Sequence, residues 1–217
     1  MASTILKASS SVAIIFAKAP IPGKAKTRLI PALGAEYAAM LHTALTERTI
    51  ATAQKSGATK VELCCAPDTM HSFFQDCAED FDVALTEQGD GDLGDRMLRA
   101  LDRSLTEFSR AIIIGADCPA FTAKHISRAI TVLDDVDIVL TPAEDGGYTL
   151  IGAKRSNPKL FDQIAWGGAT VLAEQRRNLT ACGLSWDEME TLWDVDRPDD
   201  LPRLKALKPA LEFFWPD

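Results

Sequence analysis

Four cationic residues fall within one eleven-residue segment of the chain: Lys18, Lys24, Lys26 and Arg28. Lysine and arginine neutralise phosphate charge, and arginine can do so through two parallel hydrogen bonds. Gly23, in the middle of the segment, allows the backbone to approach a ligand closely. The segment lies between a strand-like run and a helix-like run, a common place for bound phosphates. It predicts a phosphate-binding loop, with a solvated basic turn as the alternative.

The sequence excludes one known phosphate-binding motif, the P-loop, and argues against a second, the dinucleotide-binding motif. The first loop is not a P-loop, because Lys18 and Ala25 stand where that motif has Gly and Ser or Thr. The sequence GDGDLG at 89–94 matches the dinucleotide motif G-x-G-x-x-G, but its aspartates would repel a pyrophosphate and it comes late in the chain. We expect instead a loop whose backbone and polar groups, among them Gln88 and Arg96, contact a nucleoside. A tight turn before a capped helix is the alternative.

Aspartates that lie far apart in the sequence follow predicted strands. Asp117 ends a buried-looking strand, and Asp194 and Asp196 belong to the sequence DVDRPDDL. Mg²⁺ and Mn²⁺ prefer oxygen ligands, and usually take one or two carboxylates plus phosphates of the ligand. The pattern predicts a metal that bridges a diphosphate. Two alternatives remain: Asp196 caps a helix that starts near Pro198, or Asp117 is only a turn residue.

A second group of residues suits an acceptor. The turn Glu144–Tyr148 places a carboxylate, Asp145, where it can deprotonate an acceptor hydroxyl. Trp166 offers an aromatic platform. The predicted acceptor side consists of Gly146, Gly147, Tyr148 and Trp166. An ordinary polar turn and a packed core tryptophan are the alternatives.

Alternating strands and helices must position these segments. Strands are expected at 12–16, 60–65, 83–85, 111–114, 137–141 and 148–151, and helices at 36–53, 68–77, 94–108, 122–133 and 169–182. This alternation predicts an α/β fold with a mostly parallel, doubly wound sheet. Ligands bind such sheets at the carboxyl ends of the strands. We expect one domain over residues 1–217, with a core at about 12–205 and a tail at 206–217 that packs on the body or makes a dimer contact.

Composition narrows the class of protein. The chain has 217 residues, with 23 Lys and Arg against 31 Asp and Glu, a net charge of −8 that argues against a nucleic-acid partner. Its apolar run near the start is too short for a membrane span. The five cysteines lack zinc-ligand spacing, which favours a reducing, cytoplasmic location over a disulfide framework. His42, His71 and His125 form no visible triad, and the absence of G-x-S-x-G disfavours a serine hydrolase.

Five segments in order, at 16–29, 88–97, 114–119, 142–148 and 194–201, resemble the bacterial family of GT-A-fold glycosyltransferase-like proteins of the nucleotide-diphospho-sugar transferase superfamily. More distantly, the chain is similar to the 2-phospholactate and molybdenum-cofactor guanylyltransferases. The resemblance implies a Rossmann-like GT-A fold, and Asp117 and Asp196 as metal ligands. It implies nucleotide contacts from Ala17, Lys18, Pro22, Gly23, Lys24, Lys26, Thr27, Arg28, Gln88, Gly91, Asp92, Gly94 and Arg96. One departure is the segment 166–171, WGGATV, where the family is expected to have Ser or Thr followed by Pro.

The first functional hypothesis is glycosyl transfer from a nucleotide-sugar to a small acceptor, dependent on Mg²⁺ or Mn²⁺, with Asp145 and Lys24 as catalytic residues. The second is nucleotidyl transfer from a nucleoside triphosphate to a phosphorylated metabolite, with release of pyrophosphate. The third is a non-catalytic nucleotide-binding protein. A homodimer is compatible with all three.

Overall fold

A seven-stranded sheet forms the centre of the computed structural model, which describes residues 10–215. The strands are β1 (Ser11–Lys18), β2 (Lys60–Ala66), β3 (Ala84–Glu87), β4 (Arg110–Gly115), β5 (Ile138–Pro142), β6 (Tyr148–Ala153) and β7 (Trp186–Glu188). Their order across the sheet is β3-β2-β1-β4-β6-β5-β7. β6 is antiparallel to both β4 and β5, whereas the other pairs are parallel. The predicted α/β fold with a mostly parallel sheet is confirmed.

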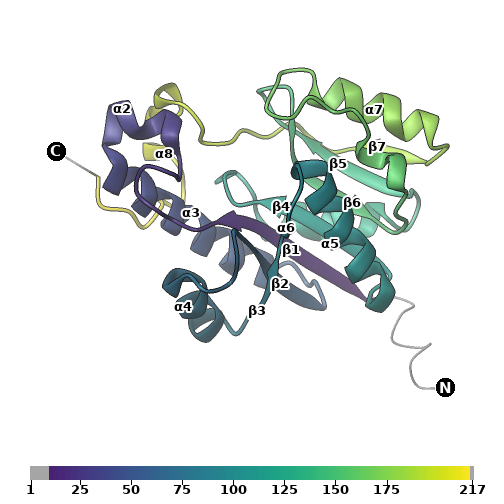
Figure 1. Ribbon diagram of the computed structural model, residues 1–217, viewed down its shortest axis with the longest axis horizontal. Coiled ribbons are helices and arrows are strands. Elements are labelled where there is room, and N and C mark those ends of the chain that lie inside the picture. The colour runs from purple at the N-terminus through teal and green to yellow at the C-terminus, as the bar shows by residue number, and fades with distance from the viewer. Residues whose placement is uncertain (1–9, 216–217) are drawn as a thin grey trace.

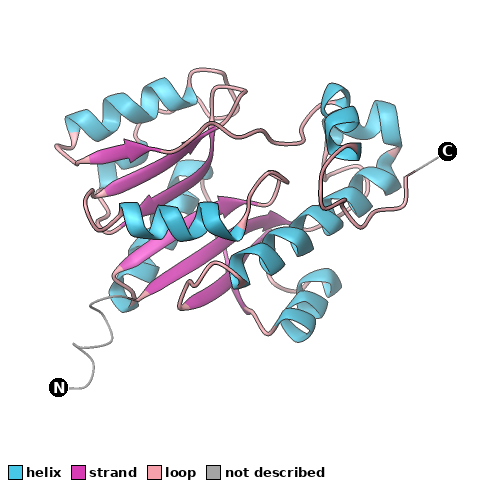
Figure 2. Ribbon diagram, turned by 180° about the vertical axis from the view of Figure 1, so that it is seen from behind, coloured by secondary structure: helices cyan, strands magenta, loops and turns pink. Residues whose placement is uncertain are grey.

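Helices cover both faces of the sheet (Figures 1 and 2). The helical elements are η2 (Thr27–Leu29), α2 (Ile30–Leu33), α3 (Ala35–Gln54), α4 (Ser72–Phe81), α5 (Leu93–Glu107), α6 (Ala123–Val132), η3 (Pro158–Phe161), α7 (Val171–Ala181), η4 (Pro198–Asp200) and α8 (Leu201–Lys205). Side chains alternate between the faces of a strand, so β1 sends Ala13 and Ile15 into the core under α3, α4 and α6, and Val12 and Ile14 into the core under α5 and α7.

A third apolar cluster joins the two ends of the chain. Leu29 and Leu33, from the segment after the first loop, pack with Val195 and Leu201 from the carboxyl-terminal part. In Figure 1 this cluster corresponds to α2 and α8, which lie side by side at one end of the molecule. The packing brings the first loop and the segment around Asp196 to one place, although almost 170 residues separate them in the sequence.

One helix is shifted and one short strand is absent from the prediction. The helix expected at 68–77 instead starts at Ser72 and ends at Phe81, so this prediction was wrong by about one turn. The Asp68 carboxylate accepts a hydrogen bond from the Met70 amide (2.8 Å) in a turn that precedes the helix. The N-cap of the helix is His71, whose side chain accepts from the Phe73 amide. The short strand β7 was missed, because its sequence WDE carries no alternating apolar pattern.

The tail packs on the body as far as it is described. Phe213 and Trp215 contact the third cluster, and Phe213 meets Tyr37 edge to face at 6.5 Å. Phe214 points outward and is 86% exposed. Residues 216–217 of the predicted tail lie outside the described part, and its role in a dimer stays a prediction. In residues 10–215, no helix is both long and apolar enough to cross a membrane.

Candidate active site at the carboxyl edge of the sheet

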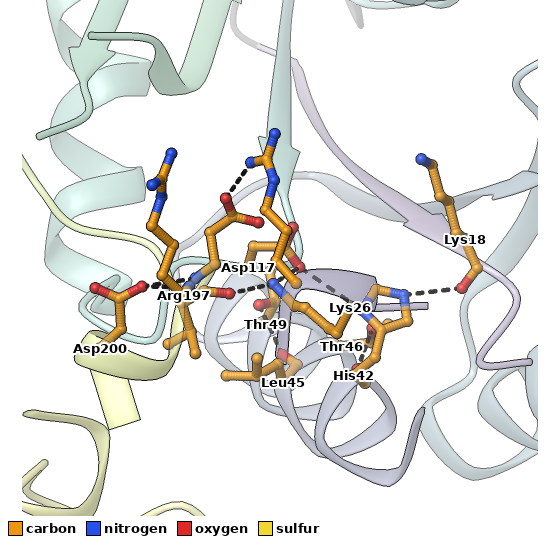
Figure 3. A network of polar contacts seen from close by, with 12 residues as sticks. Lys18, Lys26, His42, Leu45, Thr46, Thr49, Asp117, Arg197 and Asp200 are labelled. Atoms are coloured by element: carbon orange, nitrogen blue, oxygen red, sulfur yellow. Dashed lines mark hydrogen bonds and ion pairs between the residues drawn. The ribbon is translucent and has the colours of Figure 1, made fainter. Parts of the chain in front are cut away.

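Lys26 ties three separate segments of the site together. Its Nζ lies 2.8 Å from Asp117 Oδ1, just after β4, and donates a hydrogen bond to the carbonyl of Val195. Figure 3 shows Lys26, His42 and Asp117 directed toward one another. The Lys26 side chain is only 4% exposed, and its backbone has a φ of 48°, which is uncommon for a residue other than glycine. Lys26 therefore occupies a costly conformation in which its ammonium is already engaged by the protein. Its predicted contact with a nucleotide stays a prediction.

One carboxylate oxygen of Asp117 is buried, whereas the rest of its side chain is partly exposed. Its Oδ1 is buried between Lys26 and His42, while 47% of the side chain is exposed. Burial alone would raise the pKa of Asp117, but the charge of Lys26 and the contact with His42 outweigh it and hold the pKa well below its usual range. Asp117 is thus a carboxylate over the whole neutral range, with part of its side chain open to a ligand.

His42, on α3, is a neighbour of the site that the sequence did not reveal. Its Nε2 lies 2.9 Å from the carbonyl of Lys18, and its Nδ1 lies 3.6 Å from Asp117 Oδ1. A carbonyl only accepts, so Nε2 must carry the hydrogen of this bond. His42 thereby links the end of β1 to Asp117, from a helix position that gave no hint of this role.

Asp194 and Asp145 face Asp117 across a small cavity of about 140 Å³, which Cys118 and Thr149 also line. Burial, the charge of Asp145 and the charge of Asp117 raise the pKa of Asp194 to about 6, although the Asp194 backbone amide and Lys26 oppose the rise. Three carboxylates at this edge therefore carry more negative charge than the protein neutralises. Asp194 belongs to the predicted motif, although the predicted metal ligands are Asp117 and Asp196.

Asp196 has a different environment from Asp194. Its carboxylate pairs with the guanidinium of Arg28, and this contact raises the pKa of Arg28. Asp196 does not cap the following helix, so that alternative was wrong: the carboxylate of Asp200 accepts from the amides of Asp196 (2.9 Å) and Arg197 (2.7 Å). Arg28, Asp196 and Arg197 line a second cavity, of about 340 Å³, together with Asp145. Sequence reasoning also missed Arg197 as a cation at this edge.

The acidic residues fit a cation that is completed by its ligand. Within residues 10–215, no group of three or more His, Cys, Asp or Glu side chains converges closely enough to hold a metal alone. Mg²⁺ and Mn²⁺ need only one or two carboxylates when phosphates supply the remaining ligands. The exposed part of Asp117 and the unneutralised charge around Asp194 meet this requirement. The predicted pair of Asp117 and Asp196 stays a prediction.

The remaining residues of the first loop are mostly open to solvent. Lys18, Lys24 and Thr27 are exposed, as are Pro22 and Gly23 at its turn, and Ala17 is buried at the end of β1. The loop is shaped by a turn in which the amides of Lys24 and Ala25 both donate to the carbonyl of Ile21 (2.9 and 3.0 Å). Among the described residues, the Lys24 ammonium has no ion-pair partner, which leaves it available to a phosphate.

The segment from Gln88 to Arg96 is held in shape by its own polar groups. Gln88 Nε2 donates to the carbonyls of Ala17 (3.2 Å) and Cys64 (3.0 Å), at the ends of β1 and β2. Asp92 and Asp95 form a reciprocal capping box at the start of α5, as the alternative of a capped helix predicted. The guanidinium of Arg96 donates to the carbonyl of Gly91 (3.0 Å). The predicted nucleoside contacts of this segment, including those of Gly94, stay predictions.

The acceptor-side residues come together at the turn between β5 and β6. Gly146 has a φ of 90°, and a Cβ there would lie 2.3 Å from the carbonyl oxygen of Ala169. Only glycine allows this contact, which joins the turn to the loop that carries Trp166. Asp145 Oδ1 accepts from the amide of Gly147 at 2.9 Å. The exposed Asp145 carboxylate is thereby held at the mouth of an apolar pocket lined by Tyr148 and Trp166.

Comparison with known proteins agrees with this architecture. A family described as "Uncharacterized protein conserved in bacteria" (DUF2064) matches residues 49–168. The chain belongs to this family. The match covers Asp117, Asp145 and Trp166, whereas the first loop, His42 and the segment with Asp194 and Asp196 lie outside it. The predicted resemblance is confirmed.

Relatives extend the similarity over nearly the whole chain. The 2-phospho-L-lactate guanylyltransferase of Methanoculleus marisnigri is 32% identical over 184 residues, which are 83% of this chain and 76% of the relative. The crystal structure of a candidate nucleotide-diphospho-sugar transferase from Desulfovibrio desulfuricans G20 superposes with a TM-score of 0.82 and 29% identity, covering 92% of this chain and 89% of the other. The predicted GT-A-like fold is thereby confirmed.

A more distant structure shares the fold alone. It is glucosyl-3-phosphoglycerate synthase from Mycobacterium tuberculosis, in complex with Mn²⁺, uridine diphosphate and glucosyl-3-phosphoglycerate. The TM-score is 0.56 at 10% identity, over 92% of this chain and 76% of the other. The fold is therefore common to proteins named for nucleotidyl transfer and for glycosyl transfer.

Proposed function

We propose that the protein is a metal-dependent transferase that moves a sugar from a nucleotide-sugar to a hydroxyl group of a small acceptor. One observation carries the proposal. The carboxylate of Asp145 borders the acidic cavity with Asp117 and Asp194, the cavity with Arg28 and Arg197, and the apolar pocket with Trp166. A base in this position serves a hydroxyl acceptor on one side and a phosphorylated donor on the other.

The donor binds at the carboxyl ends of β1 and β4 in this proposal. Lys18, Lys24 and Arg28 supply positive charge for the diphosphate, and Lys24 has its ammonium free to stabilise the leaving group. Gln88 and the loop before α5 contact the nucleoside. Lys26 is buried, so we assign it to holding Asp117 and the Val195 carbonyl in place.

The transfer step uses residues on both sides of the cavity. The acceptor hydroxyl oxygen forms a bond to the anomeric carbon of the sugar, and the bond from this carbon to the phosphate oxygen breaks. The nucleoside diphosphate leaves with the electron pair. The hydroxyl proton passes to the carboxylate of Asp145, which the Gly147 amide orients (2.9 Å).

We propose that Asp117 and Asp196 hold the Mg²⁺ or Mn²⁺, with Asp194 beside them. A bound divalent cation neutralises charge on the leaving diphosphate. The Mn²⁺ complex of the Mycobacterium tuberculosis synthase, which has the same fold, supports a divalent cofactor. Asp117, Asp145 and Asp194, which line one cavity, give the same support from this chain.

Nucleotidyl transfer is the second candidate, because the relative with 32% identity is named a guanylyltransferase. In this reaction an acceptor phosphate oxygen attacks the α-phosphorus of a nucleoside triphosphate, and pyrophosphate leaves. The exposed cations of the first loop suit a triphosphate. Arg28 and Arg197, which line one cavity with Asp145, offer charge for an anionic acceptor.

Thermal unfolding against nucleotides, with and without Mn²⁺, tests the donor side. A ligand at about one hundred times its Kd adds roughly 2.7 kcal/mol of stability. We expect metal-dependent stabilisation by a nucleotide-sugar or nucleoside diphosphate. Stabilisation by triphosphates alone, followed by pyrophosphate release with phosphorylated acceptors, would establish the second candidate. Nucleotide binding without turnover, equally strong in Asp145→Asn, would point to a non-catalytic binding protein.

A further inference from the structure

A partly open apolar pocket lies directly beside Asp145, with a volume of about 190 Å³. Its walls come from several elements: Phe16 of β1, Leu93 and Met97 of α5, Tyr148 of β6, Trp166, and Val171 of α7. Gly94 lets α5 approach this wall, since a Cβ there would lie 3.0 Å from Trp166 Cζ2 and 2.8 Å from Phe161 Cβ. The walls are therefore in close contact with the core behind them, and the pocket is a built feature of the fold.

The polar groups of the wall are few. The hydroxyl of Tyr148 already donates to Gln175 Oε1 at 3.1 Å, and Gln175 is fully buried. The ring of Tyr148 meets that of Trp166 edge to face at 6.5 Å. Trp166 Nε1 is buried and finds no acceptor among residues 10–215. Leu93, at the start of α5, is 42% exposed, a large apolar side chain left open to solvent at this site.

The pocket is continuous with the edge where the transfer is proposed. Gly115, Asp145, Gly147, Tyr148 and Thr149 line both the apolar pocket and the acidic cavity that contains Asp117. A molecule seated against Trp166 therefore reaches the carboxylate of Asp145 with its polar end. This is the relation that a hydroxyl acceptor needs to its base.

Charge limits what the pocket accepts. Among the described residues that line it, Asp145 alone is charged, and no lysine or arginine is among them. A phosphate or carboxylate placed in the pocket would lose its hydration without gaining a cation, and would meet Asp145 with like charge. Cations line instead the neighbouring cavity, which contains Arg28 and Arg197 and shares Asp145 with the apolar pocket.

We infer that the apolar pocket holds the uncharged, apolar body of the acceptor, with its hydroxyl directed to Asp145. A cavity of about 150 Å³ accommodates benzene, so this pocket suits a ring or branched chain of similar or slightly larger size. The inference rests on the proposed function and specifies its acceptor: an alcohol with an apolar body, and not a phosphorylated metabolite.

Fluorine NMR titrations of the full chain with 4-fluorobenzyl alcohol and with 4-fluorophenyl phosphate test this inference. We expect the alcohol to bind about tenfold more tightly than the phosphate. Leu93→Asp should weaken binding of the alcohol several-fold, and aspartate is a favourable residue at the start of a helix, so the fold is kept. Trp166→Ala should weaken it as well. Met40→Asp is the matched control, because Met40 is similarly exposed (47%) on α3 and does not line the pocket.

Three outcomes would overturn the inference: tighter binding of the phosphate, binding of the alcohol that neither pocket variant weakens, or displacement of the alcohol by a free nucleoside, which would make this the base pocket. Nucleotide-sugar binding with Mn²⁺, measured on wild type and Trp166→Ala, separates this inference from the proposed function, because Trp166 lies outside the segment from Gln88 to Arg96 that is assigned to the nucleoside. Equal stabilisation of both proteins supports the division into donor and acceptor sides. If no nucleotide stabilises wild type while the alcohol binds, the apolar site stands and its role as an acceptor site falls.

Discussion

The ammonium of Lys26 lies 2.8 Å from the inner oxygen of Asp117, and the pair joins the first loop to the end of β4. A double-mutant cycle with Lys26→Met and Asp117→Asn measures this link. Removing Lys26 leaves the buried inner oxygen of Asp117 without a cation, so we expect Lys26→Met to lower the free energy of unfolding by about 2–3 kcal/mol, less than for a fully buried pair because the Asp117 side chain is 47% exposed. We expect a coupling energy of about 1–2 kcal/mol in urea titrations. Additive single mutants would show that the pair is not a structural link.

The proposed metal site depends on the carboxylates around this pair. We expect Asp117→Asn and Asp196→Asn each to weaken Mn²⁺ binding in the presence of a nucleoside diphosphate about tenfold or more, because a neutral amide replaces a charged ligand. Calorimetric titration measures the change. Asp102→Asn, at an exposed position of α5, is the control. A loss in Asp194→Asn without a loss in Asp196→Asn would transfer the second ligand to Asp194.

Gly146 and Gly57 offer a matched pair of substitutions to alanine. Both have positive φ, 90° and 83°, so alanine strains the backbone at either position. Only at Gly146 would the new Cβ also collide with the Ala169 carbonyl, whereas Gly57 has open space. We expect Gly146→Ala to cost about 1–3 kcal/mol more than Gly57→Ala in unfolding titrations. Gly146→Ala should also reduce turnover, because the displaced turn carries Asp145. Equal effects would contradict the close packing of this turn.

Asp137 connects β5 to β7, and its ionisation makes the stability of the fold depend on pH. Its Oδ2 accepts from both the amide (3.0 Å) and the hydroxyl (2.9 Å) of Ser185. Burial opposes ionisation of Asp137, but the hydrogen bonds from Ser185 prevail and lower its pKa. A lowered pKa stabilises the fold at pH values above the unfolded pKa of about 3.9, and this stability is lost as the pH falls through the folded pKa.

Asp137→Ala should therefore lower the free energy of unfolding by about 1–2 kcal/mol at pH 7. The deficit relative to wild type should shrink below about pH 4. Asp135→Ala, an exposed neighbour, serves as the control. A deficit that is constant from pH 7 to pH 3 would show that the ionised carboxylate is not the source of the stability.

Thiol reactivity reports on the core. Burial raises the pKa of Cys65, Cys77 and Cys118 to about 12, and Cys64 is fully buried as well. Cys182, at the end of α7, is the partly exposed thiol. We expect an aromatic disulfide reagent to label one thiol rapidly in the native protein and all five after unfolding, as counted by mass spectrometry. Rapid native labelling of Cys118 would show that the segment after β4 opens readily.

The sequence was most informative where a strand leads directly into a motif. Periodicity located β1, β4 and β6, and the rule that ligands bind at the carboxyl ends of strands placed Lys18, Asp117 and Asp145 at one edge. What it could not reveal depends on contacts across the fold. His42 reaches Asp117 only because α3 crosses under β1, and no local pattern announces this contact.

The partners of the charged side chains in the site were equally hard to predict from the sequence. Four cations in the first loop predicted phosphate contacts for all of them, but Lys26 turns inward to the Val195 carbonyl. Its backbone is left-handed at this position, and a lysine in a basic loop gives no sign of either feature. Likewise, Asp194 and Asp196 share one motif and both line the cavity with Arg197, but only Asp194 also lines the cavity with Asp117, and no local pattern announces this difference.

The single reversed strand, β6, has a consequence for how this architecture can diversify. Because β6 runs back from the turn at Gly146, one continuous stretch of chain supplies both Asp145 and the Tyr148 side of the apolar pocket. The cationic loop is anchored elsewhere, by α2 and α8. If the proposed function holds, substitutions in β6 and around Trp166 change which alcohol is accepted and leave the donor half untouched, so descendants of one ancestral enzyme would acquire new products through changes in a single hairpin and its neighbouring loop.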